Sequence, residues 1–262
     1  MSSPPAAEMA GELGLELLQA ANVNEPDAAE RIRAAEPDVG VVCAFGQLIR
    51  DPLLSELEML NVHPSLLPRW RGAAPIERAI MAGNEETGVT IMRLTEGLDS
   101  GPIALQEATP IQPGEDFGSL SSRLAETGGK LIVGALDLRQ AGDLELRQQD
   151  DEVATYAEKI GPGDRRLDPR RPAVELERVV RALTPHIGAH LELEGGEWLR
   201  VVAATAEDRA FALGEIEAGG GMLRLGCAEG ALRLDVVQPS GKRPMAAADY
   251  LRGHPAPPRA VV

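Results

Sequence analysis

An amide and an imidazole stand two residues apart in the segment NVHPSLLPRWRGAAPI, which runs from Asn61 to Ile76. If the chain is extended there, the side chains of Asn61 and His63 lie on the same side of a strand end. A second segment, EGLDSGPI, places the single carboxylate of Asp99 in a loop that contains two glycines. We expect these three side chains to meet in one cleft and to carry out proton-coupled acyl chemistry.

Each of these groups suits one step in the transfer of a small acyl group to an amine. The amide of Asn61 can donate to an oxygen on which negative charge develops, a contact worth about 3 kcal/mol. A neutral imidazole at His63 can accept or relay a proton near neutral pH. Asp99 can act as a general base or as a proton relay through water.

The same residues also have structural interpretations, which spacing alone leaves open. His63 could be a hydrogen-bonded residue at a strand end, Asn61 could cap a turn, and Asp99 could brace its own loop. The two arginines that flank Trp70 could form a solvated face, with the indole in the core. The sequence shows no serine elbow, phosphate-binding loop, dinucleotide glycine pattern or paired metal motif, so it predicts none of those chemistries.

The elements that must hold these groups follow from the hydrophobic pattern. An apolar run over residues 38–46 is typical of a buried parallel strand, and residues 60–63 form a second short strand. Ligands bind outside the carboxyl ends of strands in open α/β sheets, so the residues after both runs share one rim. The alternation of elements predicts an open, mostly parallel, Rossmann-like sheet. The other elements expected before residue 160 are strands over 89–94 and 103–110 and helices over 6–18, 24–35, 52–59, 75–81 and 118–138.

The composition of the chain changes near residue 161. Residues 161–172, GPGDRRLDPRRP, are dense in glycine, proline and charge, which is typical of a linker. We therefore expect a catalytic domain over residues 1–160 and a second domain over residues 173–262. The second domain begins with a helix over 173–183 and continues in short strands, which indicates a small antiparallel barrel or sandwich. Those strands are expected over 189–193, 199–203, 211–216, 222–226 and 231–237.

Charge and composition exclude several classes of protein. The 262-residue chain has a net charge of −15, which argues against general affinity for nucleic acid. Residues 161–262 hold 14 basic and 14 acidic residues, so a polyanionic partner would meet the second half more readily. No apolar run is long enough to span a membrane, and the start does not resemble a secretory signal. Cys43 and Cys227 stand singly in apolar stretches, which favours buried thiols in a cytoplasmic protein.

The motifs resemble those of a known family. The Asn-x-His and Ser-Leu-Leu-Pro pattern with a downstream aspartate is similar to that of the 10-formyltetrahydrofolate-dependent formyltransferases. The tail RWRGAAPI and the segment GVTIMRLTEGLDSGPI narrow the resemblance to the branch of methionyl-tRNA formyltransferases. The later segments VVRALTPHIGAHLELEG and DVVQPSGKRPMAAADYLRG resemble the C-terminal, OB-like barrel domain of that branch.

The resemblance implies an activity and a set of site residues. The formyl group of 10-formyltetrahydrofolate would move to the α-amine of methionine on initiator tRNA, without a metal. Asn61, His63 and Asp99 match the catalytic residues of the family. We expect a monomer whose basic residues Arg165, Arg166, Arg170, Arg171, Lys242 and Arg243 are candidates for contact with tRNA phosphates. The positions that match the family's folate-contacting residues are Phe45, Gly46, Gln47, Leu48, Ile49, Ser65, Leu66, Leu67 and Pro68.

Two departures from the family keep other functions open. The resemblance implies that the chain lacks the family's first βαβ segment, which would leave an incomplete sheet. Residues 184–189, TPHIGA, stand where the family more often has an Asn-Pro-Trp-Pro-like stretch. One alternative is therefore a folate-dependent formyltransferase or hydrolase for another amine, such as that of a sugar nucleotide. Another is an inactive fragment that binds folate or tRNA.

Overall fold

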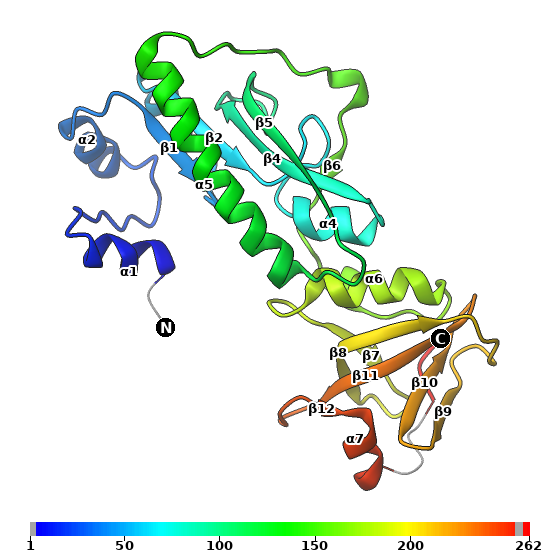
Figure 1. Cartoon of the computed structure of the whole chain (residues 1–262). Helices are drawn as coiled ribbons and strands as arrows, with labels where there is room; N and C mark the ends of the chain where they lie inside the picture. Colours follow the sequence, from blue (N-terminus) through cyan, green and yellow to red (C-terminus); the bar gives the residue numbers. More distant parts are fainter. Residues whose placement is uncertain (1–3, 255–258) are drawn as a thin grey trace.

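The computed structural model describes residues 4–254 and 259–262, and its first half is built on a four-stranded mixed sheet (Figure 1). The order is β1-β2-β4-β5, with β1 and β2 parallel and the other two pairs antiparallel. The expected mostly parallel sheet is therefore wrong. The loop that joins β4 to β5 covers residues 94–102, which is shorter than the dozen or so residues that a parallel crossover needs. The strands span Gly40–Cys43 (β1), Met59–His63 (β2), Glu86–Arg93 (β4) and Ile103–Pro110 (β5).

Two helices pack against this sheet and form most of its core. Helix α5, Phe117–Ala141, crosses one face of the sheet and buries Leu120 and Leu124 there (Figure 1). A side chain at Gly128 would meet Val62 of β2, so glycine permits the close approach of helix and sheet. Helix α4, Pro75–Met81, begins with proline in its first turn, as expected, and buries apolar side chains in the same core.

The first strand is less enclosed than its sequence suggests. In β1, residues alternate between half-buried and exposed, and Val41 is 48% exposed. Cys43 lies on the same exposed face, so the expectation that this run is fully buried is wrong. Among the described residues, β1 pairs only with β2, so its other edge has no partner strand. Three short helices accompany this part of the chain, namely α1 (Pro5–Glu12), α2 (Pro26–Ala34) and α3 (Leu53–Glu56).

The second half is an antiparallel sheet, with one helix before its strands in the sequence and one after them. Its strand order is β7-β8-β11-β10-β9, with β12 paired to β11. Within the described residues the end strands β7 and β9 do not pair, so the expected OB-like barrel is not confirmed. The run 211–216 turns at Gly214, whose φ is 70°, so it cannot supply the strand that was expected there. The elements are α6 (Ala173–Leu183), β7 (Ala189–Glu192), β8 (Trp198–Glu207), β9 (Ile216–Gly219), β10 (Met222–Gly226), β11 (Ala231–Pro239), β12 (Met245–Ala246) and α7 (Ala247–Gly253).

Helix α6 connects the two halves, because it packs on α4 as well as on β8 (Figure 1). Around it, Arg78 of α4 pairs with Asp164 at 2.8 Å, and His186 contacts Glu77 at 3.0 Å. The ring of His186 also stacks on Phe117, with ring centres 3.6 Å apart. The halves therefore meet through an apolar helix contact flanked by polar ones. Residues 161–172, expected as a linker, include the short 3-10 helix Gly163–Arg165.

Residues 142–160 follow α5 and lead to the second half of the chain, and we call this segment the strap. Residues Tyr156–Ala157 (β6) pair in parallel with Arg71–Gly72 (β3), and a 3-10 turn at Asp151–Val153 precedes them. Both short strands were absent from the sequence-based expectations, because two-residue strands have no hydrophobic period. In residues 4–254 and 259–262, no helix has the length and apolarity needed to cross a membrane.

Candidate active site

Strand β2 places the amide and the imidazole on one face. Asn61 and His63 are 8% and 4% exposed, and β2 pairs with neighbours on both edges there. His63 Nε2 donates a hydrogen bond to the carbonyl oxygen of Trp70 at 2.9 Å. A carbonyl only accepts, so the proton of the neutral ring sits on Nε2 and the lone pair sits on Nδ1. Nδ1 lies 3.6 Å from Asp99 Oδ2.

Asp99 is held in an uncommon backbone conformation. Its φ is 46°, in the left-handed region that residues with a Cβ seldom adopt. The backbone N–H of Gly72 donates to Asp99 Oδ2 at 2.8 Å, which fixes one carboxylate oxygen beside His63. The structure therefore brings His63 and Asp99 together, as the sequence predicts.

Burial and charge act on His63 in opposite directions. Burial lowers the pKa of His63 below its usual value of 6.5, while the Asp99 carboxylate and the Trp70 carbonyl partly offset this effect. The ring is therefore neutral at neutral pH, with its unprotonated nitrogen turned towards a carboxylate. Such a group can accept a proton from a nucleophile bound beside it.

The side chain of Thr90 forms hydrogen bonds with the backbone of the segment Ser65–Pro68. The Thr90 hydroxyl, which is fully buried, donates to the Ser65 carbonyl at 2.6 Å and accepts from the Leu67 N–H at 3.2 Å. The Ser65 hydroxyl donates to the Arg69 carbonyl at 2.7 Å. Leu67 is buried, whereas Leu66 and Pro68 are half-buried. The hydroxyl of Ser65 thus holds the loop, and the half-buried side chains remain for contact with a ligand.

The loop from Phe45 to Ile49 begins on the same rim as the site. Cys43 pairs with Val62 in parallel register, so the chain leaves β1 beside the end of β2. The side chain of Gln47 donates to the Ala21 carbonyl at 2.7 Å, which ties the loop to the preceding segment. The loop carries two exposed apolar side chains, Phe45 at 44% and Leu48 at 60% exposure, with Gly46 between them.

The structure also shows two residues whose place in the site the sequence did not predict. Arg71 is 3% exposed, so the interpretation of this arginine as part of a solvated face is wrong. Its guanidinium donates to Gln149 Oε1 at 2.8 and 3.0 Å and pairs with Asp151 at 2.7 Å. Gln149 lies 78 residues further along the chain, and no local sequence pattern signals such a contact.

The basic residues expected to contact phosphate differ in how they are paired. Arg170 pairs with Asp168 at 2.7 Å, and Arg171 pairs with Glu175 at 3.0 Å. Arg165 donates to two backbone carbonyls, and Arg166 lies 3.5 Å from a carboxylate. Lys242 and Arg243 are exposed, and within the described residues neither forms an ion pair. Among the described residues, Lys242 and Arg243 therefore carry positive charge that no carboxylate neutralises, unlike Arg170 and Arg171.

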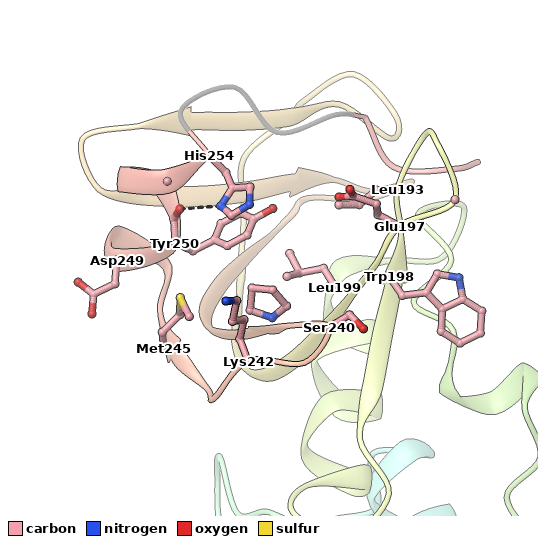
Figure 2. Close-up of a pocket in the computed structure, with 13 residues that line it drawn as sticks. Leu193, Glu197, Trp198, Leu199, Ser240, Lys242, Met245, Asp249, Tyr250 and His254 are labelled. Atoms are coloured by element: carbon pink, nitrogen blue, oxygen red, sulfur yellow. Dashed lines mark hydrogen bonds between the residues drawn. The ribbon is translucent and has the colours of Figure 1, made fainter.

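Lys242 borders a hollow of about 890 Å³ in the second half, shown in Figure 2. Tyr250 and His254 stack on one side of it, with ring centres 4.3 Å apart. Trp198 points away from its centre and stacks on His190. Across residues 4–254 and 259–262, no group of three potential metal ligands comes together.

Both halves of the chain match one protein family. Residues 1–136 match the formyl transferase family, and residues 159–255 match the formyl transferase C-terminal domain. The methionyl-tRNA formyltransferase of Halorhodospira halophila is 44% identical over 260 residues, which is 97% of this chain and 83% of that protein. The methionyl-tRNA formyltransferase of Pseudomonas paraeruginosa is 45% identical over 244 residues, which is 92% of this chain and 78% of that protein.

A solved structure supports the fold. HypX from Aquifex aeolicus, determined in complex with tetrahydrofolic acid, superimposes with a TM-score of 0.68 at 21% identity. The match covers 87% of this chain and 41% of HypX.

Proposed function

This chain belongs to the formyl transferase family, and on that premise we propose that it formylates initiator methionyl-tRNA. The donor is 10-formyltetrahydrofolate, and the acceptor is the α-amino group of the methionine. The chain is then a cytoplasmic, monomeric transferase of translation initiation. Residues 1–160 form its catalytic domain, residues 161–172 its linker and residues 173–262 its tRNA-binding domain.

Asn61 supplies the hydrogen bond that stabilises the transition state. The residue is only 8% exposed, yet its side chain has no hydrogen-bond partner among the described residues. The amide is thus free to donate to the formyl oxygen as the amine attacks and that oxygen gains negative charge. A donor held in place before the reaction needs no reorganisation, which is why such contacts lower barriers.

His63 and Asp99 handle the proton. The methionine nitrogen attacks the formyl carbon, a C–N bond forms, and the nitrogen must lose a proton. The lone pair of His63 Nδ1 accepts it, and the Asp99 carboxylate at 3.6 Å stabilises the resulting imidazolium. The bond between the formyl carbon and N10 of the folate then breaks, and the proton passes to N10. Atoms and charge balance without a metal.

The folate donor is proposed to lie between two loops on the rim. The loop Phe45–Ile49 offers exposed apolar side chains, and the segment Ser65–Pro68 offers half-buried Leu66 and Pro68. Flat apolar walls with a few polar groups are typical of sites for ring systems such as a pterin.

One observation carries the proposed mechanism, namely the approach of His63 Nδ1 to Asp99 Oδ2 with Nε2 already committed to the Trp70 carbonyl. A histidine with a structural role only would be expected to use both ring nitrogens in hydrogen bonds. Here one nitrogen is anchored by the Trp70 carbonyl, and the other is left facing the Asp99 carboxylate.

The choice of acceptor is tested by comparing the rates of formyl transfer to different acceptors. The purified chain is given 10-formyltetrahydrofolate with initiator methionyl-tRNA, an amino-sugar nucleotide or water alone, and formyl product and released folate are measured. We expect transfer to methionyl-tRNA at a rate well above that to either alternative. Preferential formylation of the sugar nucleotide, or release of formate without transfer, would replace the proposed acceptor. Folate binding without any turnover would indicate an inactive binding protein.

A further inference from the structure

The side chain of Gln149 joins the two loops that carry the site. Its Nε2 donates to the carbonyl oxygens of Asp99 at 2.9 Å and Gly101 at 2.7 Å. Its Oε1 accepts from Nε and Nη2 of Arg71 at 3.0 and 2.8 Å. The amide therefore uses both of its hydrogens and both of its oxygen lone pairs.

This arrangement requires a glutamine. A glutamate would have no hydrogens for the two carbonyls, and an asparagine would be one methylene too short to keep all four bonds. The orientation of the amide is also determined, since a flipped amide would turn its NH2 group towards a guanidinium and its oxygen towards two carbonyls.

The two ends of the Gln149 amide support Asp99 in different ways, the NH2 group through its backbone and the oxygen through Arg71. One holds the carbonyl of Asp99 itself, in a residue whose φ of 46° needs support from its surroundings. The other holds the side chain of Arg71, whose neighbour Gly72 donates its N–H to Asp99 Oδ2. The strap is anchored just before Gln149, because Arg147 and Ile103 exchange two backbone hydrogen bonds of 2.7 and 2.8 Å.

We propose that Gln149 is a positioning residue that holds the Asp99 carboxylate against His63 by linking the 99–101 loop to Arg71. Gln149 does not itself contact the reacting atoms. This inference rests on the proposed formyl transfer for its catalytic consequence, but the geometry that it describes can be measured without turnover.

The test compares Gln149→Met with Gln148→Met. The first substitution keeps the length of the side chain and removes all four hydrogen bonds. The second is the same change at the exposed neighbouring residue, whose side chain makes no hydrogen bond among the described residues. We expect Gln149→Met to lower kcat by about 10- to 100-fold with little change in KM for the folate, because small misplacements of a catalytic group are costly. Gln148→Met should match the parent.

The second readout is the titration of His63, followed by NMR of the imidazole and assigned with a His63→Gln variant. The nearby Asp99 charge raises the pKa of His63, so its displacement in Gln149→Met should lower that pKa further. Gln149→Leu, which removes the same hydrogen bonds and also adds no charge near His63, should show the same direction of change. It carries the test if Gln149→Met does not fold.

The outcomes separate the two proposals. Lower thermal stability in the Gln149 variants with an unchanged His63 titration and unchanged kcat would overturn the positioning role and leave only a structural one. A parent chain that transfers no formyl group would contradict the proposed function. In that case a shifted His63 titration would still support the positioning of Asp99 by Gln149.

Discussion

At the scale of single residues, the site depends on which nitrogen of His63 carries the proton. The Trp70 carbonyl fixes the proton on Nε2, and Trp70 itself lies in the left-handed region with a φ of 63°. Nδ1 is left as the acceptor next to Asp99. The tautomer is thus set by a backbone group of the same segment that follows β2, and not by a second carboxylate.

The first prediction concerns pH. Burial lowers the pKa of His63 below 6.5, so the neutral, proton-accepting ring persists as the pH falls below that value. The acid limb of kcat/KM, measured between about pH 5 and pH 8, should therefore lie below 6.5. The unfolded chain binds this proton at higher pH than the folded chain does, so the same group destabilises the fold as the pH falls through 6.5 and below. An acid limb above 6.5 would show that the Asp99 charge outweighs burial.

The second prediction concerns the amide of Asn61. Asn61→Ala should lower kcat by about 100-fold through loss of one donor to the developing oxyanion. Asn61→Asp, which keeps the shape but loses the donor hydrogens, should be impaired at least as much. The measurement is steady-state formylation, with circular dichroism to confirm that both variants fold. Parent-like turnover in both variants would remove Asn61 from the mechanism.

At the scale of elements, strand β4 supports the loop that follows β2. Thr90 provides that support through a buried hydroxyl with three partners, the third being Gln106 at 2.8 Å. Thr87, on the same strand and 2% exposed, has a buried hydroxyl that finds no hydrogen-bond partner among the residues that the structure describes. The two threonines are alike in type and burial and differ in what their hydroxyls do.

The third prediction uses this contrast. Thr90→Val leaves the Leu67 N–H without its partner and should lower the free energy of unfolding by about 1–3 kcal/mol, with a higher KM for the folate. Thr87→Val is the matched control and should be neutral or stabilising, because it removes a hydroxyl that is buried unpaired. Chemical denaturation of both variants measures the difference. Equal losses in the two variants would show that the Thr90 hydrogen bonds contribute little.

Much of the fold could be predicted from the sequence because strong hydrophobic periods mark it. The helices at 75–81 and 173–183 and the strands at 103–110 and 222–226 begin and end where they are expected. The antiparallel direction of β4 was not predictable from its own residues, because it depends on the path of the chain between β2 and β4. The approach of His63 to Asp99 was predicted from residue type and motif, whereas the strap that holds Asp99 joins residues far apart in the chain and left no local pattern.

At the scale of the whole molecule, the two halves are coupled through α6 and the residues around it. Arg78 and Asp164 form a bidentate, partly buried pair across this junction, and the hydrogen bond from Arg78 lowers the pKa of Asp164 below 3.8. His186, which lies in the segment TPHIGA, stacks on Phe117 and contacts Glu77 at 3.0 Å. The departure TPHIGA is thus compatible with a closed junction.

The fourth prediction concerns tRNA binding. Lys242→Gln combined with Arg243→Gln should weaken binding of methionyl-tRNA and lower the slope of log K against log salt by about one per residue removed. Arg170→Gln is the control, because Arg170 is already paired with Asp168 and should change the slope less. Filter binding over a range of salt concentrations measures both. An unchanged slope in the double variant would place the phosphate contacts elsewhere.

The central claim is that His63, beside Asp99 and Asn61, transfers a formyl group to a tRNA-borne amine. Single-turnover transfer of labelled formyl from 10-formyltetrahydrofolate to initiator methionyl-tRNA tests it most directly, with the parent chain and His63→Gln compared at saturating folate. We predict labelled formylmethionyl-tRNA from the parent and a rate at least about 100-fold lower from His63→Gln, with folate binding retained. No labelled tRNA from the folded parent, or equal rates for the two proteins, would contradict the account.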